Sequence, residues 1–224
     1  MARLTALDNA MGDLFSREEA PDRWLAPGAL HLPGGATRLG PSSRWLHAWI
    51  DAVSARAPFR HMQTPGGQTM SVAMTNAGPL GWVSDRQGYR YSPLDPLSHV
   101  PWPPLPPELL ELARRGAEAA GFAGFVPDAC LINRYEPGAR MSLHQDRDEA
   151  DLNHPIVSLS LGLGAEFLLG GLGRRDPVLR LILHGGDLLV LGGEARLRFH
   201  GVAPLKAGAE GEVRFNLTLR RAAP

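Results

Sequence analysis

The tetrapeptide Leu143-His144-Gln145-Asp146 is the stretch around which the rest of the chain can be organised. His144 and Asp146 are two residues apart, so in an extended strand both side chains lie on the same face. An imidazole and a carboxylate placed in this way can bind a divalent metal, and one more histidine would complete the 2-His-1-carboxylate set that holds non-haem Fe(II). About 0.8 His-x-Asp/Glu pairs are expected by chance in a chain with 8 histidines and 23 acidic residues. The tetrapeptide therefore needs a third ligand and a suitable fold around it.

From residue 129 onward, short segments alternate apolar and polar residues with a period of two, which is typical of strands. We predict strands at 129–135, 156–163, 166–169, 178–183, 187–191, 198–202 and 213–220. Turn pairs separate them, such as Pro137-Gly138, Gly170-Gly171, Gly185-Gly186 and Gly192-Gly193. Short strands without intervening helices predict an antiparallel sandwich or jelly roll.

The first 128 residues carry different patterns. Residues 1–41 are interrupted by proline and glycine and predict an arm packed on the core. Ser42 or Ser43 can cap one helix, and a second helix is predicted over residues 108–120. Residues 62–92 predict short strands and loops. The fold class is therefore mainly β with flanking helices (α+β).

Composition limits the classes of protein that the chain can belong to. Of its 224 residues, 44% are hydrophobic and 21% are charged, which is ordinary for a globular protein. Its single cysteine, Cys130, excludes an intrachain disulfide framework and a thiolate zinc cluster and fits a reducing cytoplasm. No long apolar run predicts a signal peptide or a membrane span. The formal net charge is +0, so a nucleic-acid-binding face would have to be local.

Two predicted strands carry polar faces that point to a lined cavity. One face of the last strand carries Arg214, Asn216, Thr218 and Arg220, and one face of the first strand of the core carries Asn133 and Tyr135. A solvated edge strand would explain one such face, but two of them in a small barrel favour a cavity. A buried guanidinium needs an anionic partner, and a small dicarboxylate suits two arginines through bidentate pairing.

The third metal ligand has three candidates downstream of Asp146. His154 precedes a proline at a strand entrance, and His184 lies in a glycine turn, so both are interpreted as loop residues. His200 lies on a late strand and suits a ligand supplied by a neighbouring strand of a jelly roll.

Together these residues resemble the AlkB family of Fe(II)/2-oxoglutarate dioxygenases, especially its bacterial alkylation-repair members. The resemblance covers roughly residues 40–221. Beyond the metal motif and the last strand, it rests on Asp128-Ala-Cys-Leu-Ile-Asn133-Arg-Tyr135, Pro155-Ile-Val-Ser-Leu-Ser-Leu-Gly162, Gly185-Gly-Asp187, Thr64-Pro-Gly-Gly67, Met74-Thr-Asn76, Gly81-Trp82 and Tyr89-x-Tyr91.

The resemblance implies a role for each of these candidate residues. The iron ligands and catalytic centre correspond to His144, Asp146 and His200. The 2-oxoglutarate site corresponds to Asn133, Tyr135, Arg214, Asn216 and Arg220. The nucleic-acid substrate is expected to contact Trp82, Tyr89, Asp148, Arg174, Thr64 and Arg140, with Asp148 facing the exocyclic amine of the damaged base. Two departures from the family pattern are Gln68, which stands where an aromatic residue is expected, and a rather short loop between His200 and Arg214.

The resemblance also implies a double-stranded β-helix core at 129–224, a nucleotide-recognition lid with flanking helices at 42–128, and the arm at 1–41, all in one compact domain. The implied enzyme is a monomeric cytoplasmic oxidative demethylase that uses Fe(II), 2-oxoglutarate and O2. Its expected substrate is alkylated DNA, preferably single-stranded, with RNA as a further candidate. A metal-dependent cupin-like hydrolase or isomerase, such as a zinc enzyme, and a non-catalytic nucleic-acid-binding module are the alternatives.

Overall fold

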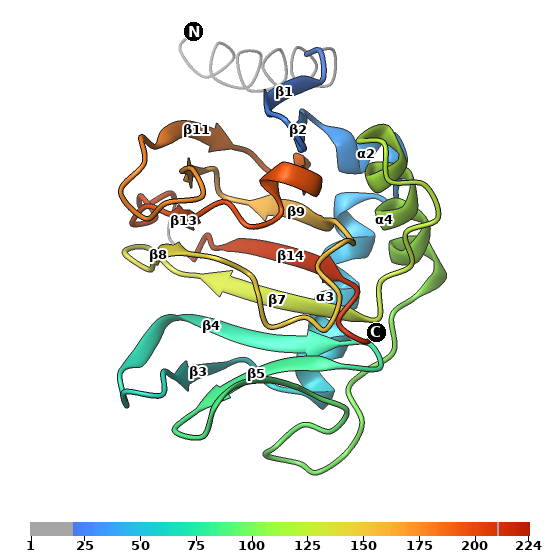
Figure 1. Cartoon of the computed structure of the whole chain (residues 1–224). Coiled ribbons are helices and arrows are strands. Elements are labelled where there is room, and N and C mark those ends of the chain that lie inside the picture. The colour runs from blue at the N-terminus through green and yellow to red at the C-terminus, as the bar shows by residue number, and fades with distance from the viewer. Residues whose placement is uncertain (1–19, 210) are drawn as a thin grey trace, which may run out of the picture.

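The computed structural model describes residues 20–209 and 211–224, and more than half of the strands in this part form one antiparallel sheet (Figure 1). Its strand order is β1-β2-β12-β9-β14-β7-β4-β3. In chain order these strands are β1 (Arg23–Ala26), β2 (Ala29–Leu32), β3 (Arg60–Gln63), β4 (Thr69–Ala77), β7 (Ala129–Tyr135), β9 (Ile156–Gly162), β12 (Leu188–Leu191) and β14 (Arg214–Arg220). Its centre is built from β9, β14 and β7, which the period-two pattern predicts within one residue at each end.

A smaller antiparallel sheet packs against the large one. Its order is β11-β10-β13-β8, and its strands are β8 (Met141–His144), β10 (Ala165–Leu169), β11 (Leu179–Leu183) and β13 (His200–Val202). Apolar side chains from both sheets share one buried cluster, as Phe167 of β10 and Leu189 of β12 show. The two sheets form the predicted jelly roll.

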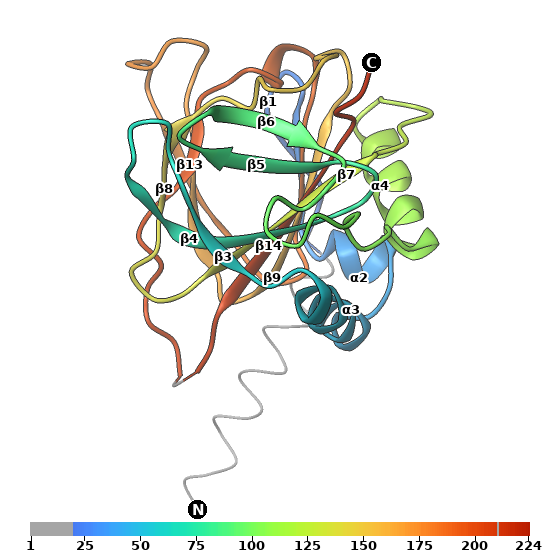
Figure 2. The ribbon, with the colours of Figure 1, turned by 90° about the horizontal axis from the view of Figure 1, so that it is seen from below.

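Three α-helices of the described chain cover the outer face of the large sheet: α2 (Gly35–Leu39), α3 (Ser43–Arg56) and α4 (Pro107–Ala119). Figure 2 shows them together on one side of the molecule. The Ser42 side chain caps α3, as predicted, and Pro107 occupies the first turn of α4. Leu46 of α3 and Leu112 of α4 pack in the same buried cluster as Leu217 of β14. A short 3-10 turn, η1 (Gly193–Ala195), follows β12.

Strand β14 sends its side chains alternately to the two faces of the large sheet. Leu217 and Leu219 are buried in the cluster beneath the helices, whereas Arg214 and Arg220 line a cavity on the other face. The two arginines are only 1% and 6% exposed. Because side chains alternate along a strand, a slip of one residue would place both guanidinium groups among the leucines. The hydrophobic pattern therefore fixes the register that delivers two cations to the cavity.

A separate hairpin covers the mouth of the jelly roll, made of β5 (Gly81–Asp85) and β6 (Gly88–Ser92). We call this hairpin, together with the β3–β4 turn at residues 64–68, the lid. The buried side chain of Asn76 in β4 fastens the hairpin, because its Oδ1 accepts a hydrogen bond from Trp82 N (3.0 Å) and its Nδ2 donates to Trp82 O (2.9 Å). The Asn76 side chain therefore joins β4 of the large sheet to β5 of the hairpin at the backbone of Trp82.

Two parts of the structure add to or differ from the predictions. Strand β8 ends at His144, so Asp146 lies in the loop that follows and does not share the strand as predicted. Residues 20–41 of the predicted arm contain β1, β2 and α2, and β2 pairs with β12; the rest of the arm, residues 1–19, lies outside the described residues. The large sheet draws strands from all three predicted segments, 1–41, 42–128 and 129–224, whose boundaries stay a prediction. Among the described residues, no helix is long and apolar enough to cross a membrane.

Candidate active site

A cavity of about 690 Å³ lies between the two sheets and beneath the lid. Every site residue predicted from the sequence lines this cavity, namely Thr64, Trp82, Tyr89, Asn133, Tyr135, Arg140, His144, Asp146, Asp148, Arg174, His200, Arg214, Asn216 and Arg220. Neither His154 nor His184 does so, in agreement with their interpretation as loop residues. The structure therefore gathers side chains from across the sequence into one site.

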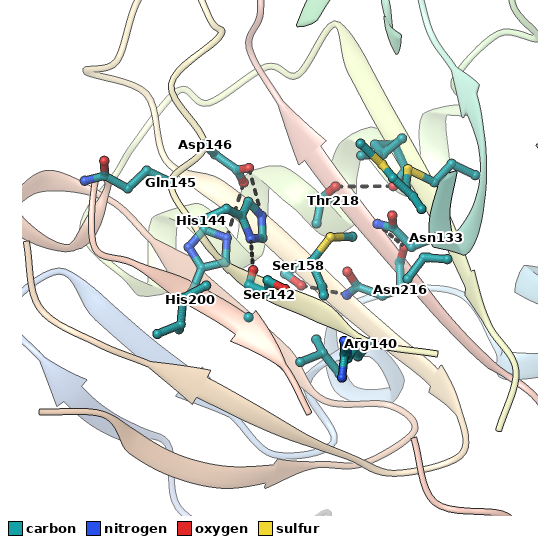
Figure 3. Close-up of a pocket in the computed structure, with 18 of the residues that line it drawn as sticks. Asn133, Arg140, Ser142, His144, Gln145, Asp146, Ser158, His200, Asn216 and Thr218 are labelled. Carbon is teal, nitrogen blue, oxygen red and sulfur yellow. Dashed lines mark hydrogen bonds and ion pairs between the residues drawn. The ribbon is translucent and has the colours of Figure 1, made fainter. Parts of the chain in front are cut away.

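The three predicted metal ligands converge at one end of the cavity (Figure 3). His144 ends β8 and His200 begins β13, and the two residues are direct partners in the antiparallel register. Their Nε2 atoms lie 3.5 Å and 3.6 Å from the carboxylate oxygens of Asp146. One ligand atom from each side chain lies within 4.8 Å of the others, which fits a single metal ion. Two imidazoles and one carboxylate form the donor set that suits Fe(II) and leaves coordination positions open.

Backbone hydrogen bonds set the tautomer of both histidines. His144 Nδ1 lies 2.9 Å from the carbonyl oxygen of Ser142, and His200 Nδ1 lies 3.0 Å from that of Arg198. A carbonyl oxygen can only accept, so each Nδ1 carries the proton and each Nε2 presents a lone pair. Both lone pairs are directed toward Asp146, as a metal site requires.

The carboxylate of Asp146 is held in its charged form. Burial alone would raise its pKa, but Arg220, whose Nη2 lies 2.7 Å from Oδ2, and the two histidines hold this pKa well below its usual range. Burial would lower the pKa of His144, yet Asp146 raises it. Asp146 is therefore ionised at neutral pH and ready to bind a cation.

A buried network that sequence reasoning missed supports this carboxylate. Arg196 Nη1 donates to the carbonyl oxygen of Asp146 (2.6 Å), and its Nη2 lies 2.9 Å from Glu149 Oε2. The Tyr91 hydroxyl donates to Glu149 Oε1 (2.7 Å) and accepts from Arg220 Nη1 (3.2 Å). Glu149 follows three charged residues in the sequence, which is typical of a solvated loop, and no local pattern reveals its distant partners.

At the other end of the cavity, Arg214 lacks an anionic partner among the described residues. Its guanidinium donates only to neutral groups, the hydroxyl of Ser160 (2.7 Å) and the carbonyl oxygens of Leu163 (3.1 Å) and Leu183 (3.2 Å). Burial lowers its pKa. Arg214 Nε and Asn133 Oδ1 are buried atoms for which the described chain supplies no hydrogen-bond partner. An unpaired buried cation is costly, so this end of the cavity fits a carboxylate ligand.

Besides the two sheets, the lid also lines the cavity. The rings of Trp82 and Tyr89 stack with centroids 5.6 Å apart and planes inclined by 16°. Trp82 Nε1 donates to Asp148 Oδ2 (2.9 Å), so the lid reaches the loop that carries the metal ligands. Arg174 lies over the ring of Phe199, 5.6 Å from its centroid. Gln68, which replaces the expected aromatic residue, also lines the cavity.

A jelly roll with two histidines, one carboxylate and a buried cationic pocket beside them defines a mononuclear non-haem iron oxygenase that takes an acidic co-substrate. The model of the 2OG-Fe(II) oxygenase superfamily matches residues 19–220. "Alpha-ketoglutarate-dependent dioxygenase AlkB" of Salmonella typhimurium is 55% identical over 216 residues, which span 95% of this chain and 99% of that protein. The chain therefore belongs to the AlkB family within the 2OG-Fe(II) oxygenase superfamily, and the enzyme uses Fe(II), 2-oxoglutarate and O2.

Two more distant proteins extend the comparison. "Nucleic acid dioxygenase ALKBH1" of Mus musculus is 36% identical over 134 residues, which are 59% of this chain and 34% of that protein. The solved structure "The structure of OsALKBH1" has a TM-score of 0.76 and 25% sequence identity, over 90% of this chain and all of the other.

Replacing Asp146 by alanine should abolish Fe(II)-dependent succinate formation, because the only carboxylate of the metal set is lost. Calorimetric titration with Mn(II) should show the loss of metal binding directly, and circular dichroism should show that the fold survives. Asp151→Ala, at an acid in the same loop outside the cavity lining, is the matched control and should keep normal turnover. Full activity of the Asp146→Ala variant would contradict the metal assignment.

Proposed function

We propose that this enzyme oxidatively removes N-alkyl groups from nucleobases of the 1-methyladenine and 3-methylcytosine type, preferably in single-stranded DNA and also in RNA. The observation that carries the proposal is the position of an aromatic pair, Trp82 and Tyr89, and of a carboxylate, Asp148, in the same cavity as the iron ligands. A flat base with an exocyclic amine is the chemical group that matches such a wall. The names of the relatives reported above, an alpha-ketoglutarate-dependent dioxygenase and a nucleic acid dioxygenase, also support an oxidation that acts on nucleic acid.

The two arginines of β14 orient the co-substrate between them. Arg220 lies 2.7 Å from Asp146 of the predicted metal set, so it would hold the carboxylate of the co-substrate that is nearer to this set. Arg214 lies at the far end of the same strand and takes the distal carboxylate, with Tyr135 as its direct neighbour on β7. Asn133 and Asn216, opposite each other on these strands, provide further polar contacts between the two ends.

When bound, Fe(II) and 2-oxoglutarate would supply the oxidising chemistry, in which O2 converts 2-oxoglutarate to succinate and CO2 and oxidises the N-methyl group. The oxidised methyl group would then leave the base as formaldehyde. The protein contributes orientation and the exclusion of water. A base must leave its helix to reach the cavity, at a cost of a few kcal/mol that is smaller for single strands and for damaged bases. Stacking on the lid can offset about 1–3 kcal/mol of this cost.

Asp148 is placed to select the base. Its Oδ2 is engaged by the indole N–H of Trp82, which leaves Oδ1 to accept a hydrogen bond from an exocyclic amine. Adenine and cytosine carry such an amine at the edge of the ring, whereas guanine and thymine present a carbonyl oxygen at the corresponding position. The basic side chains of Arg140 and Arg174, with the hydroxyl of Thr64, line the cavity and can contact the phosphates.

The buried Arg214 separates this proposal from the alternatives. A cupin-like hydrolase or isomerase would need the metal ligands alone and gives no reason for an arginine without an anion. A non-catalytic binding module would need neither the complete ligand set nor the co-substrate pocket.

The direct test is to incubate the enzyme with Fe(II), 2-oxoglutarate and oligonucleotides that each carry one methylated base, and to follow each base by mass spectrometry. We expect methyl loss from 1-methyladenine and 3-methylcytosine together with formaldehyde and succinate, faster in single-stranded DNA than in a duplex. Succinate formation without methyl loss from any base would contradict the proposed substrate class.

Asp148→Ala should reduce kcat/KM for 1-methyladenine and 3-methylcytosine about 10- to 100-fold more than for 1-methylguanine and 3-methylthymine, because a hydrogen bond to a charged acceptor is lost. Parallel kinetics on the four oligonucleotides measure the ratio. An equal loss on all four would show that Asp148 has a structural role instead.

Trp82→Ala should weaken nucleic-acid binding by roughly 5- to 150-fold through the loss of about 1–3 kcal/mol of stacking. Its thermal midpoint and its turnover of 2-oxoglutarate without nucleic acid should change little. Trp102→Ala is the matched control, because Trp102 is a core residue at 4% exposure and its loss should cost about 3–5 kcal/mol of stability. A melting-temperature drop in Trp82→Ala as large as in Trp102→Ala would assign Trp82 to the core.

A further inference from the structure

Asp187 is a buried carboxylate to which the reaction described above gives no role. It is 4% exposed and lies just before β12. Its Oδ1 accepts from Gly34 N (3.0 Å), and its Oδ2 accepts from His184 N (2.9 Å) and lies 3.1 Å from His31 Nε2, which donates to it. Burial would raise the pKa of Asp187, but these hydrogen bonds, led by the one from His31, lower it below its usual value. A charged group is therefore fixed inside the protein.

The hydrogen bonds of Asp187 lead to the groups that hold Arg214. The Arg214 guanidinium donates to Leu183 O and to Ser160 Oγ. Leu183 directly precedes the residue whose N–H is bound by the Asp187 carboxylate. Ser160 N donates to Asp187 O (3.0 Å) and Ser160 O accepts from Gly186 N (2.8 Å). Two of the three residues that accept hydrogen bonds from Arg214 are thus positioned by the turn that Asp187 organises.

Asp187 also acts on Arg214 through its charge. Burial lowers the pKa of the Arg214 guanidinium, and the nearby Tyr135 and Asp187 oppose this effect. Asp187 acts at longer range than an ion pair, since the hydrogen-bond partners of Arg214 among the described residues are all neutral. Asp187 can therefore steady the cation without occupying the position that an incoming carboxylate would take.

We propose that Asp187, which accepts a hydrogen bond from His31 of β2, is a positioning residue that keeps Arg214 oriented for the distal carboxylate of the co-substrate. This inference rests on the role proposed above for Arg214. It extends the co-substrate site to β2, a strand outside the predicted jelly-roll segment, because His31 pairs with Leu189 of β12. The effect is confined to ligands that carry a distal carboxylate.

The test compares two 2-oxo acids on the full-length protein loaded with Mn(II), without turnover. 2-Oxoglutarate has the distal carboxylate and 2-oxobutyrate lacks it, and calorimetric titration gives the affinity for each. Asp187→Asn keeps the size of the side chain and removes its charge. We expect its affinity for 2-oxoglutarate to fall about tenfold while its affinity for 2-oxobutyrate stays unchanged, and we expect KM for 2-oxoglutarate to rise with little change in kcat.

Three further variants separate this effect from a general loss of stability. Asp95→Asn removes the charge of another buried carboxylate, which is 1% exposed and paired with Arg60 of β3, and should lower the melting temperature without changing either affinity. His31→Leu removes the donor to Asp187 and should reproduce part of the selective loss, whereas His31→Gln, which can still donate, should restore it. The affinity for 2-oxoglutarate should thus be lower in His31→Leu than in His31→Gln. This comparison tests the proposal if Asp187→Asn does not fold.

The outcomes are distinguishable. If Arg214→Gln leaves the 2-oxoglutarate affinity unchanged, the proposed role of Arg214 is wrong. If Arg214→Gln lowers that affinity and the Asp187 and His31 variants do not, the positioning role alone is overturned. An equal loss of affinity for both 2-oxo acids in Asp187→Asn would also overturn it, because that result assigns Asp187 to the general architecture.

Discussion

The ion pair between Arg220 and Asp146 joins the predicted metal ligands to the cationic part of the cavity, and the rest of the cavity depends on it. Its nitrogen–oxygen distance is 2.7 Å, and both side chains are at most 10% exposed. Breaking a buried pair by removing one partner leaves an uncompensated charge and typically costs about 3–5 kcal/mol. The pair forms only if β14 has its observed register and if the loop after β8 is held by Arg196 and Glu149. The contacts that bury Arg220 therefore also position Asp146 of the predicted metal set. A substitution that moves one of these two side chains would also move the other.

The buried charges also explain why the metal and the co-substrate suit the cavity together. Arg214 has only neutral hydrogen-bond acceptors, so the pocket around it has an excess of positive charge. A dicarboxylate brings two negative charges to this pocket, and Fe(II) brings two positive charges to the carboxylate of Asp146. Binding both leaves the net charge of the cavity unchanged, whereas binding either one alone changes it by two units in a region of low dielectric. Electrostatics thus favour a complex in which the metal and the 2-oxo acid are bound side by side.

The sequence predicted the parts of this site whose signals are local or periodic. The alternation in β14 placed Arg214 and Arg220 on one face, and the pair His144 and Asp146 with His200 supplied a complete ligand set. The loop position of Asp146 was not predicted, because a two-residue spacing does not say where a strand ends. Glu149 was missed because its partner Arg196 lies 47 residues further along the chain, directly after a 3-10 turn that has no period of its own. The β1–β2 hairpin was missed for a related reason, since four buried residues next to a turn do not form a pattern until β12 pairs with them.

The lid and the jelly roll divide the work of the enzyme. The metal ligands and the arginines lie on β8, β13 and β14 or directly beside them, whereas Trp82 and Tyr89 lie on a two-stranded hairpin with its own hydrogen bonds. The polar contacts between the two parts include the Asn76 amide at the backbone of Trp82, the Trp82 indole at Asp148, and the Tyr91 hydroxyl of β6 between Glu149 and Arg220. A change at the Trp82 or Tyr89 ring can therefore alter this wall of the cavity while the predicted metal ligands keep their geometry, because the registers that place those ligands lie in the sheets beneath. The proposed selection of the base thus depends on a few lid side chains, whereas the proposed metal and co-substrate contacts depend on the strand registers of the two sheets.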